Sequence, residues 1–175
     1  MTKSSKSISE NNESVSTEKT LFQRVGDFLE SKGWNYRSIT DHHYHEMIMD
    51  LESSSVRMIF DVEDSEGWNR VKLVLIFPVF VPKRTRDAVM EKINVTNRVI
   101  DCGSFDIDLR DGEIRYRNSL ETMEAITDET LQHQFVRSLY YAEVYFEKLM
   151  AVAFKAEEQV SEKMDERRPE GEMLQ

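Results

Sequence analysis

The 175-residue sequence is poor in the residues that cross-link or interrupt small folds, with one cysteine, three prolines and six glycines. The single cysteine, Cys102, has no partner for an internal disulfide, which fits a reducing compartment. A redox nucleophile is the less favoured interpretation; beside Gly103 we expect a small buried residue. The sequence also lacks a Gly-rich phosphate loop, a nucleophile elbow, an HExxH motif and a CxxC pair. No motif therefore indicates an enzyme or a cofactor.

Long apolar runs and clustered basic residues are missing as well. No apolar stretch approaches the roughly 18 residues of a membrane span, and the polar start has no signal-peptide core. The formal charge is −10, and Lys and Arg form no stripe. Because nucleic-acid affinity depends on clustered cations, we expect neither a nucleic-acid nor a membrane partner. These absences together favour a cytoplasmic protein.

The sequence does contain enough apolar residues, 39%, for one domain with a core. Residues 1–17 are mostly Ser, Asn, Glu and Lys, so ordering them would cost entropy without compensating burial. We expect them to form a disordered tail. The composition predicts a single domain over residues 18–156, followed by a charged, disordered tail over residues 157–175.

Three segments have the apolar spacing of helices. The first covers residues 18–32, with Thr17 or Thr20 as N-cap and a glycine stop after Lys32. The second covers residues 84–99. The last starts at Thr127, where two following acids suit the helix dipole.

Alternating residues predict two hairpins, each with one apolar face. In the first, the predicted pairs around a Ser-rich turn are Leu51 with Val56, Met49 with Met58, Met47 with Phe60 and Asp50 with Arg57. In the second, a type I′ turn at Asp111-Gly112 gives the pairs Arg110 with Glu113, Leu109 with Ile114, Asp108 with Arg115, Ile107 with Tyr116 and Asp106 with Arg117. Carboxylates that face arginines keep low pKa values. The charges of residues 101–120 are therefore interpreted as scaffold.

Residues 68–81, WNRVKLVLIFPVFV, begin as an alternating strand and become apolar on both faces. The last helix likewise carries more apolar surface than a one-sided helix needs. One interpretation is that all of this is core. The other is a homodimer whose groove or sheet edge accepts a peptide from a partner protein. The candidate interface residues are Val74, Ile76, Phe80, Tyr140, Tyr141 and Tyr145.

These segments follow the order α-β-β-β-α-β-β-α. The order gives three strands joined by tight turns, then a helix and then a hairpin. These elements pack most simply as an antiparallel sheet with the helices on one face. The sequence therefore predicts an α+β fold with a five-stranded sheet.

Several stretches in this order resemble the YbjN-like family of bacterial sensory transduction regulators. They are the entry LFQRVGDFLESKGWNY, the strand ending LIFPVFVP, Asn97 ahead of Cys102-Gly103-Ser104-Phe105, the hairpin LRDGEIRYRNSL and the helix YAEVYFEKLMAVAF. The resemblance covers most of residues 20–154. It implies a fold of the type III secretion chaperone kind and a non-enzymatic domain that binds other proteins, as a regulator or chaperone-like adaptor. It transfers no site residue.

The alternative function is a metal-binding protein or a metal-dependent enzyme that uses His42, His43 and His45. In a strand, His43 and His45 would lie on one side, and two imidazoles at that spacing can chelate zinc or nickel. A stable site needs a third and fourth ligand, for which His133 and Asp64 are distant candidates. The favoured interpretation is an exposed strand end without a metal.

Overall fold

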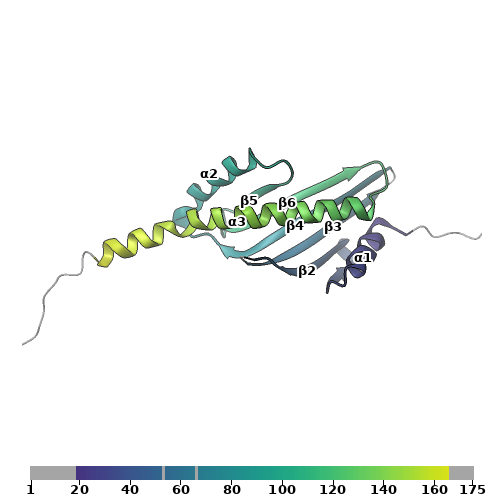
Figure 1. The fold of residues 1–175 in the computed structure, drawn as a ribbon, viewed down its shortest axis with the longest axis horizontal. Coiled ribbons are helices and arrows are strands. Elements are labelled where there is room, and N and C mark those ends of the chain that lie inside the picture. The colour runs from purple at the N-terminus through teal and green to yellow at the C-terminus, as the bar shows by residue number, and fades with distance from the viewer. Residues whose placement is uncertain (1–18, 53, 66, 166–175) are drawn as a thin grey trace, which may run out of the picture.

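Within the residues that the computed structural model describes, 19–165 without 53 and 66, six strands form one antiparallel sheet accompanied by three α-helices (Figure 1). The strand order is β1-β2-β3-β4-β6-β5. In chain order the elements are α1 (Leu21–Ser31), β1 (Arg37–Ile39), the 3-10 turn η1 (Thr40–His42), β2 (Tyr44–Asp50), β3 (Ser55–Ser65), β4 (Trp68–Phe80), the 3-10 turn η2 (Lys83–Thr85), α2 (Arg86–Asn97), β5 (Ser104–Ile107), β6 (Glu113–Thr122) and α3 (Asp128–Asp165).

The predicted α+β class and antiparallel sheet are confirmed, but the predicted count of five strands is wrong. The missed strand, β1, is three residues long and pairs with β2 at one edge of the sheet. Three residues are too few for an alternating pattern to stand out, so the sequence carries no recognisable signal for this strand.

Helix ends follow the predicted capping residues. Thr20 is the N-cap of α1, and its hydroxyl and the Gln23 side chain form a reciprocal capping box. At the start of α3, Thr130 N donates to Thr127 Oγ1 at 3.2 Å. Helix α3 projects beyond the sheet to Asp165, so the helical backbone includes part of the expected C-terminal tail (Figure 1). The rest of that tail and residues 1–17 lie outside the described residues. No described helix is long and apolar enough to cross a membrane.

The predicted register of the first hairpin is wrong by two residues. Met47 faces Met58, and Met49 faces Val56. Leu51 N donates to Ser54 O at 2.7 Å, so the turn is tighter than the predicted one. Asp50 consequently faces Ser55 and not the predicted arginine. An even shift leaves each side chain on its predicted face.

The second hairpin is also shifted by two residues in the same sense, although its loop is wider than predicted. Asp106 faces Arg115, because the loop from Asp108 closes through Gly112 N, which donates to Asp108 O at 2.6 Å. Gly112 has a φ of +90°, but Asp111 lacks the positive φ that a type I′ turn requires. Leu109 therefore lies in the loop with 52% of its surface exposed, although the alternation placed it on the apolar face.

The sheet has one covered and one open face. Helix α3 lies across the covered face, with α1 and α2 toward opposite edges of the sheet (Figure 1). The alternate residues of the two long central strands that point toward the helices are buried: Val56, Met58, Phe60 and Val62 of β3, and Val71, Leu73, Leu75 and Phe77 of β4. The intervening residues of β3 and β4 point to the other face, which no described element covers. This open face is where β4 carries its second set of apolar residues.

Candidate functional site

The open face of the sheet carries a group of apolar side chains, which we call the apolar band. It consists of Ile48 on β2, Ile59 on β3, and Val74, Ile76 and Phe80 on β4. Ile59 and Val74 are direct cross-strand partners. Ile48 is 65% exposed and Phe80 is 62% exposed, and the other three are half-buried. Apolar surface of this kind gains about 25 cal/mol for each Å² that a partner removes from water.

Ion pairs border the apolar band. Glu46 is the most buried of these charges, and hydrogen bonds from Arg57 and then Arg37 hold the pKa of its carboxyl below the usual value. Further pairs on this face are Lys72 with Asp61, Arg70 with Glu63, Arg115 with Glu113 and Arg117 with Asp106. Because these charges are mutually compensated, the face is close to neutral on a chain that carries −10 overall. Such a surface can approach another protein without strong repulsion.

The residues predicted for a partner or dimer interface lie on two different surfaces. Val74, Ile76 and Phe80 are in the apolar band, as described above. The three tyrosines lie on α3, on the covered side of the sheet. Of these, Tyr140 is 59% exposed and Tyr145 is half-buried, whereas Tyr141 is only 7% exposed. Its hydroxyl donates to Asp101 Oδ2 at 3.0 Å, which makes it part of the scaffold.

The three neighbouring histidines do not converge. His42 ends η1, and His43 has a left-handed backbone with a φ of 51°, so the strand alternation assumed for this segment does not hold. His45 is 2% exposed beneath α1. Its Nε2 donates to Phe22 O and its Nδ1 accepts from Ser38 Oγ, both at 2.9 Å. Among the described residues, no group of three His, Cys, Asp or Glu side chains is placed to hold a metal ion.

His45 should make stability depend on pH. Burial lowers its pKa below the usual 6.5, and the hydrogen bond to Phe22 O only partly opposes this. As pH falls below about 6.5, the unfolded chain gains a proton that the folded chain does not. The free energy of unfolding should then fall by up to about 1.4 kcal/mol per pH unit until the folded pKa is reached. Urea unfolding from pH 7.5 to 5 measures this, and the His45→Gln variant should have a flatter profile. Parallel profiles for the two proteins would rule His45 out as the cause.

Asn97 and Gly103 support the second hairpin. The Asn97 side chain donates to Phe105 O and accepts from Phe105 N, both at 2.9 Å, so it ties the end of α2 to β5. Gly103 has a φ of +68° and lies against Tyr116, a close approach that a glycine permits. Cys102 is half-buried beside them. These residues position strands, in line with the scaffold interpretation of residues 101–120.

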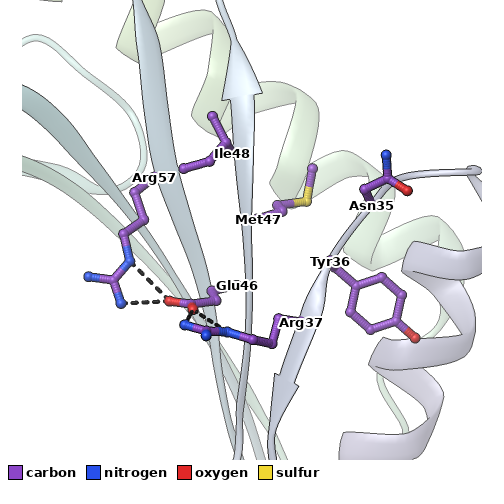
Figure 2. A pocket seen from close by; sticks show the side chains of 7 residues that line it. All are labelled: Asn35, Tyr36, Arg37, Glu46, Met47, Ile48 and Arg57. Carbon is purple, nitrogen blue, oxygen red and sulfur yellow. Dashed lines mark hydrogen bonds and ion pairs between the residues drawn. The ribbon is translucent and has the colours of Figure 1, made fainter.

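Sequence reasoning missed a pocket of about 300 Å³ at the edge of the sheet. It lies where β1 begins, between Tyr36 and Arg37 on one side and Glu46, Ile48 and Arg57 on the other (Figure 2). Its position depends on where β1 begins, and this short strand has no recognisable sequence pattern. The one available signal was Ile48, an apolar residue on the mainly polar side of the predicted hairpin.

The fold has relatives among solved structures. The crystal structure of YbjN, "a putative transcription regulator from E. coli", is similar with a TM-score of 0.58 and 14% identity, over 76% of this chain and 92% of that chain. The HopA1-SchA chaperone-effector complex is similar with a TM-score of 0.44 and 17% identity, over 69% of this chain and 90% of that chain. The first likeness shows a shared fold. A search of the curated proteins finds no match.

The family is settled by sequence. Residues 22–150 match the model of the YbjN family, described as "Putative bacterial sensory transduction regulator". The match runs from α1 into α3 and so includes every strand of the sheet and both faces. The chain belongs to the YbjN family.

Proposed function

We propose that the protein is a non-enzymatic adaptor that binds a segment of another polypeptide on the open face of its sheet. The observation that carries this proposal is the apolar band, in which Ile48 and Phe80 are each more than half exposed. Exposed apolar patches bordered by polar groups are typical of protein interaction sites. The compensated ion pairs around the band fit the same role.

The family description supports a regulatory adaptor, since a regulator acts by contacting other macromolecules. The related E. coli protein is described as "a putative transcription regulator". For this chain we propose regulation through protein contact, because a charge of −10 opposes direct binding to nucleic acid. A bacterial, cytoplasmic setting and a homodimer are predictions that accompany this proposal.

Partner capture from the native host tests the proposal, with Phe80→Ala and Tyr140→Ala as matched variants. Both replace a ring of similar exposure, but Phe80 lies on the open face and Tyr140 on α3. Loss of an anchoring aromatic should weaken binding by about 2 kcal/mol, roughly thirtyfold. We expect this loss for Phe80→Ala only. If the captured partner depends on Tyr140 instead, the proposed face is wrong.

Two further measurements separate the alternatives. Sedimentation at tens of micromolar shows whether two copies associate, and a strict monomer would remove the homodimer. Elemental analysis of purified protein tests the metal alternative, since stoichiometric zinc or nickel would favour it over an adaptor.

A further inference from the structure

One edge of the sheet is only partly paired. Strand β1 pairs with Tyr44–Glu46 of β2, which leaves Met47–Asp50 without a neighbour on that side among the described residues. Val62 N donates to His43 O, and Leu51 N donates to Ser54 O. In an antiparallel pair, the N–H and C=O groups of every second residue bond to the same neighbouring strand. His43 and Leu51 bond on the side of β3, so the odd-numbered residues of β2 direct these groups toward β3. Ile48 and Asp50 therefore direct their N–H and C=O groups outward.

The position of Trp34 explains why β1 does not cover this edge. Trp34 N donates to Leu29 O at 3.4 Å, and its ring packs on Phe135 with centroids 4.4 Å apart. The chain before Tyr36 is thereby held in the helix layer, away from the sheet. Continued backward, β1 would bring Asn35 opposite Ile48. Instead, Asn35 lines the pocket of about 300 Å³ described above.

The charges beside this open edge are ordered along β2. Glu46 accepts from Arg57 Nη2 at 2.6 Å and from Arg37 Nε at 2.8 Å. Two guanidinium groups thus share one carboxylate, and the side chains of Arg37 and Arg57 are 72% and 48% exposed. This end of the edge carries one excess positive charge. Asp50, at the other end, carries a negative charge and accepts one hydrogen bond from Ser55.

The side chains at the edge alternate in direction. In Figure 2, Ile48 and Met47 extend to opposite sides of β2, with Arg57 and Glu46 on the side of Ile48. In an added strand, a residue opposite Ile48 would share the open face and lie near the two arginines. A residue opposite Asp50 would share that face too. The residue between them would point toward Met47 and Met49, which favour an apolar side chain.

We propose that this edge of β2 binds an extended segment of a partner protein as an additional antiparallel strand, with the order basic, apolar, acidic. The basic residue lies opposite Asp50, and the acidic residue lies opposite Ile48. This inference rests on the proposed function and assigns it a binding site and a partner chemistry. Backbone hydrogen bonds supply affinity, and the charges at the two ends set register and direction.

A second copy of the chain fits this edge less well. The four free residues are fewer than the five or six of an average strand, and β1 of each copy would lie close to the other. An independent, extended segment also meets only four free residues, but it brings no second copy of β1 to the edge.

Two synthetic peptides of equal composition test the site in the full chain. The first is acetyl-Ser-Val-Lys-Val-Glu-Val-amide, whose last residue would lie opposite Met47, and the second exchanges Lys and Glu. NMR titration should show the first peptide shifting the amides of Ile48 and Asp50 and slowing their hydrogen exchange. The exchanged peptide should bind about tenfold more weakly, a difference of about 1.4 kcal/mol. Equal binding, or shifts elsewhere, would overturn the inference.

Backbone and charge variants localise the effect. Ile48→Pro removes an outward N–H and leaves the ladder to β3 intact, whereas Ile48→Thr keeps the N–H. Proline should reduce binding of the first peptide about tenfold, and threonine should not. Arg37→Gln should reduce the difference in affinity between the two peptides, because it removes a positive charge near the residue opposite Ile48. Circular dichroism confirms that each variant is folded, and equal peptide binding by the proline and threonine variants contradicts the proposal.

The same variants separate this inference from the proposed function. If a captured host protein still binds Ile48→Pro but is lost with Phe80→Ala, the adaptor stands and the edge site is wrong. If no polypeptide is retained by the unaltered chain, both fail. Sedimentation that changes with Ile48→Pro would identify a second copy as the occupant and would also overturn the inference.

Discussion

Replacing Gly103 with alanine should lower the free energy of unfolding by about 4 kcal/mol. Gly103 has a φ of +68°, and a Cβ there would lie 2.3 Å from Tyr116 Oη and 2.6 Å from Arg117 O. The tyrosine cannot easily move, because it is fully buried and its hydroxyl donates to Cys102 O at 2.8 Å. Relief of the overlap must therefore displace β5 or β6. Urea unfolding followed by circular dichroism measures the change.

Gly33→Ala is the matched control for this prediction. Gly33 has nearly the same φ, +70°, but a Cβ there would meet no atom within 4 Å. Its cost should be that of the left-handed backbone alone, about 1 kcal/mol. A similar loss in the two variants would mean that the contact with Tyr116 carries no penalty, and the close approach would then be irrelevant to stability.

The faces of the strands could be predicted from sequence more reliably than their pairing. Both hairpin registers were wrong by two residues, because Leu51–Ser54 forms a tighter turn than expected and the loop ending at Gly112 a wider one. Neither turn follows from residue type alone, since a Ser-rich or Asp-Gly turn can close in several ways. An even shift preserves which face each side chain occupies. Strand β4 lies outside both hairpins, and the alternation along residues 68–81 is sufficient to separate its buried side chains from Val74, Ile76 and Phe80.

The features of the site that the sequence did not predict depend on tertiary contacts. Tyr141 has the same local signal as Tyr140, but its hydroxyl reaches Asp101 and it is buried. The open edge of β2 depends on Trp34 being held by Leu29 and Phe135. Such contacts join residues far apart in the chain, and no local pattern encodes them.

The pair Phe77→Ala and Phe80→Ala tests the two-sided character of β4 directly. Phe77 is 1% exposed and stacks on Phe146 with ring centroids 4.0 Å apart. Removing its ring should leave a cavity and lower the free energy of unfolding by about 4 kcal/mol. Phe80, three residues away, is 62% exposed, and its replacement should cost less than about 1 kcal/mol. Chemical denaturation of both variants in the same buffer compares their free energies of unfolding.

A double-mutant cycle sharpens this result. Phe146 is 4% exposed in the native chain. Combining Phe77→Ala with Phe146→Ala should give a coupling free energy of about 1 kcal/mol, because the two rings are direct neighbours. Phe80→Ala should show no coupling to Phe146→Ala. If Phe80→Ala instead destabilised the isolated chain as much as Phe77→Ala, its side chain would belong to the core. The open face would then be unavailable to a partner, since a residue already buried within the fold gains little from further contact.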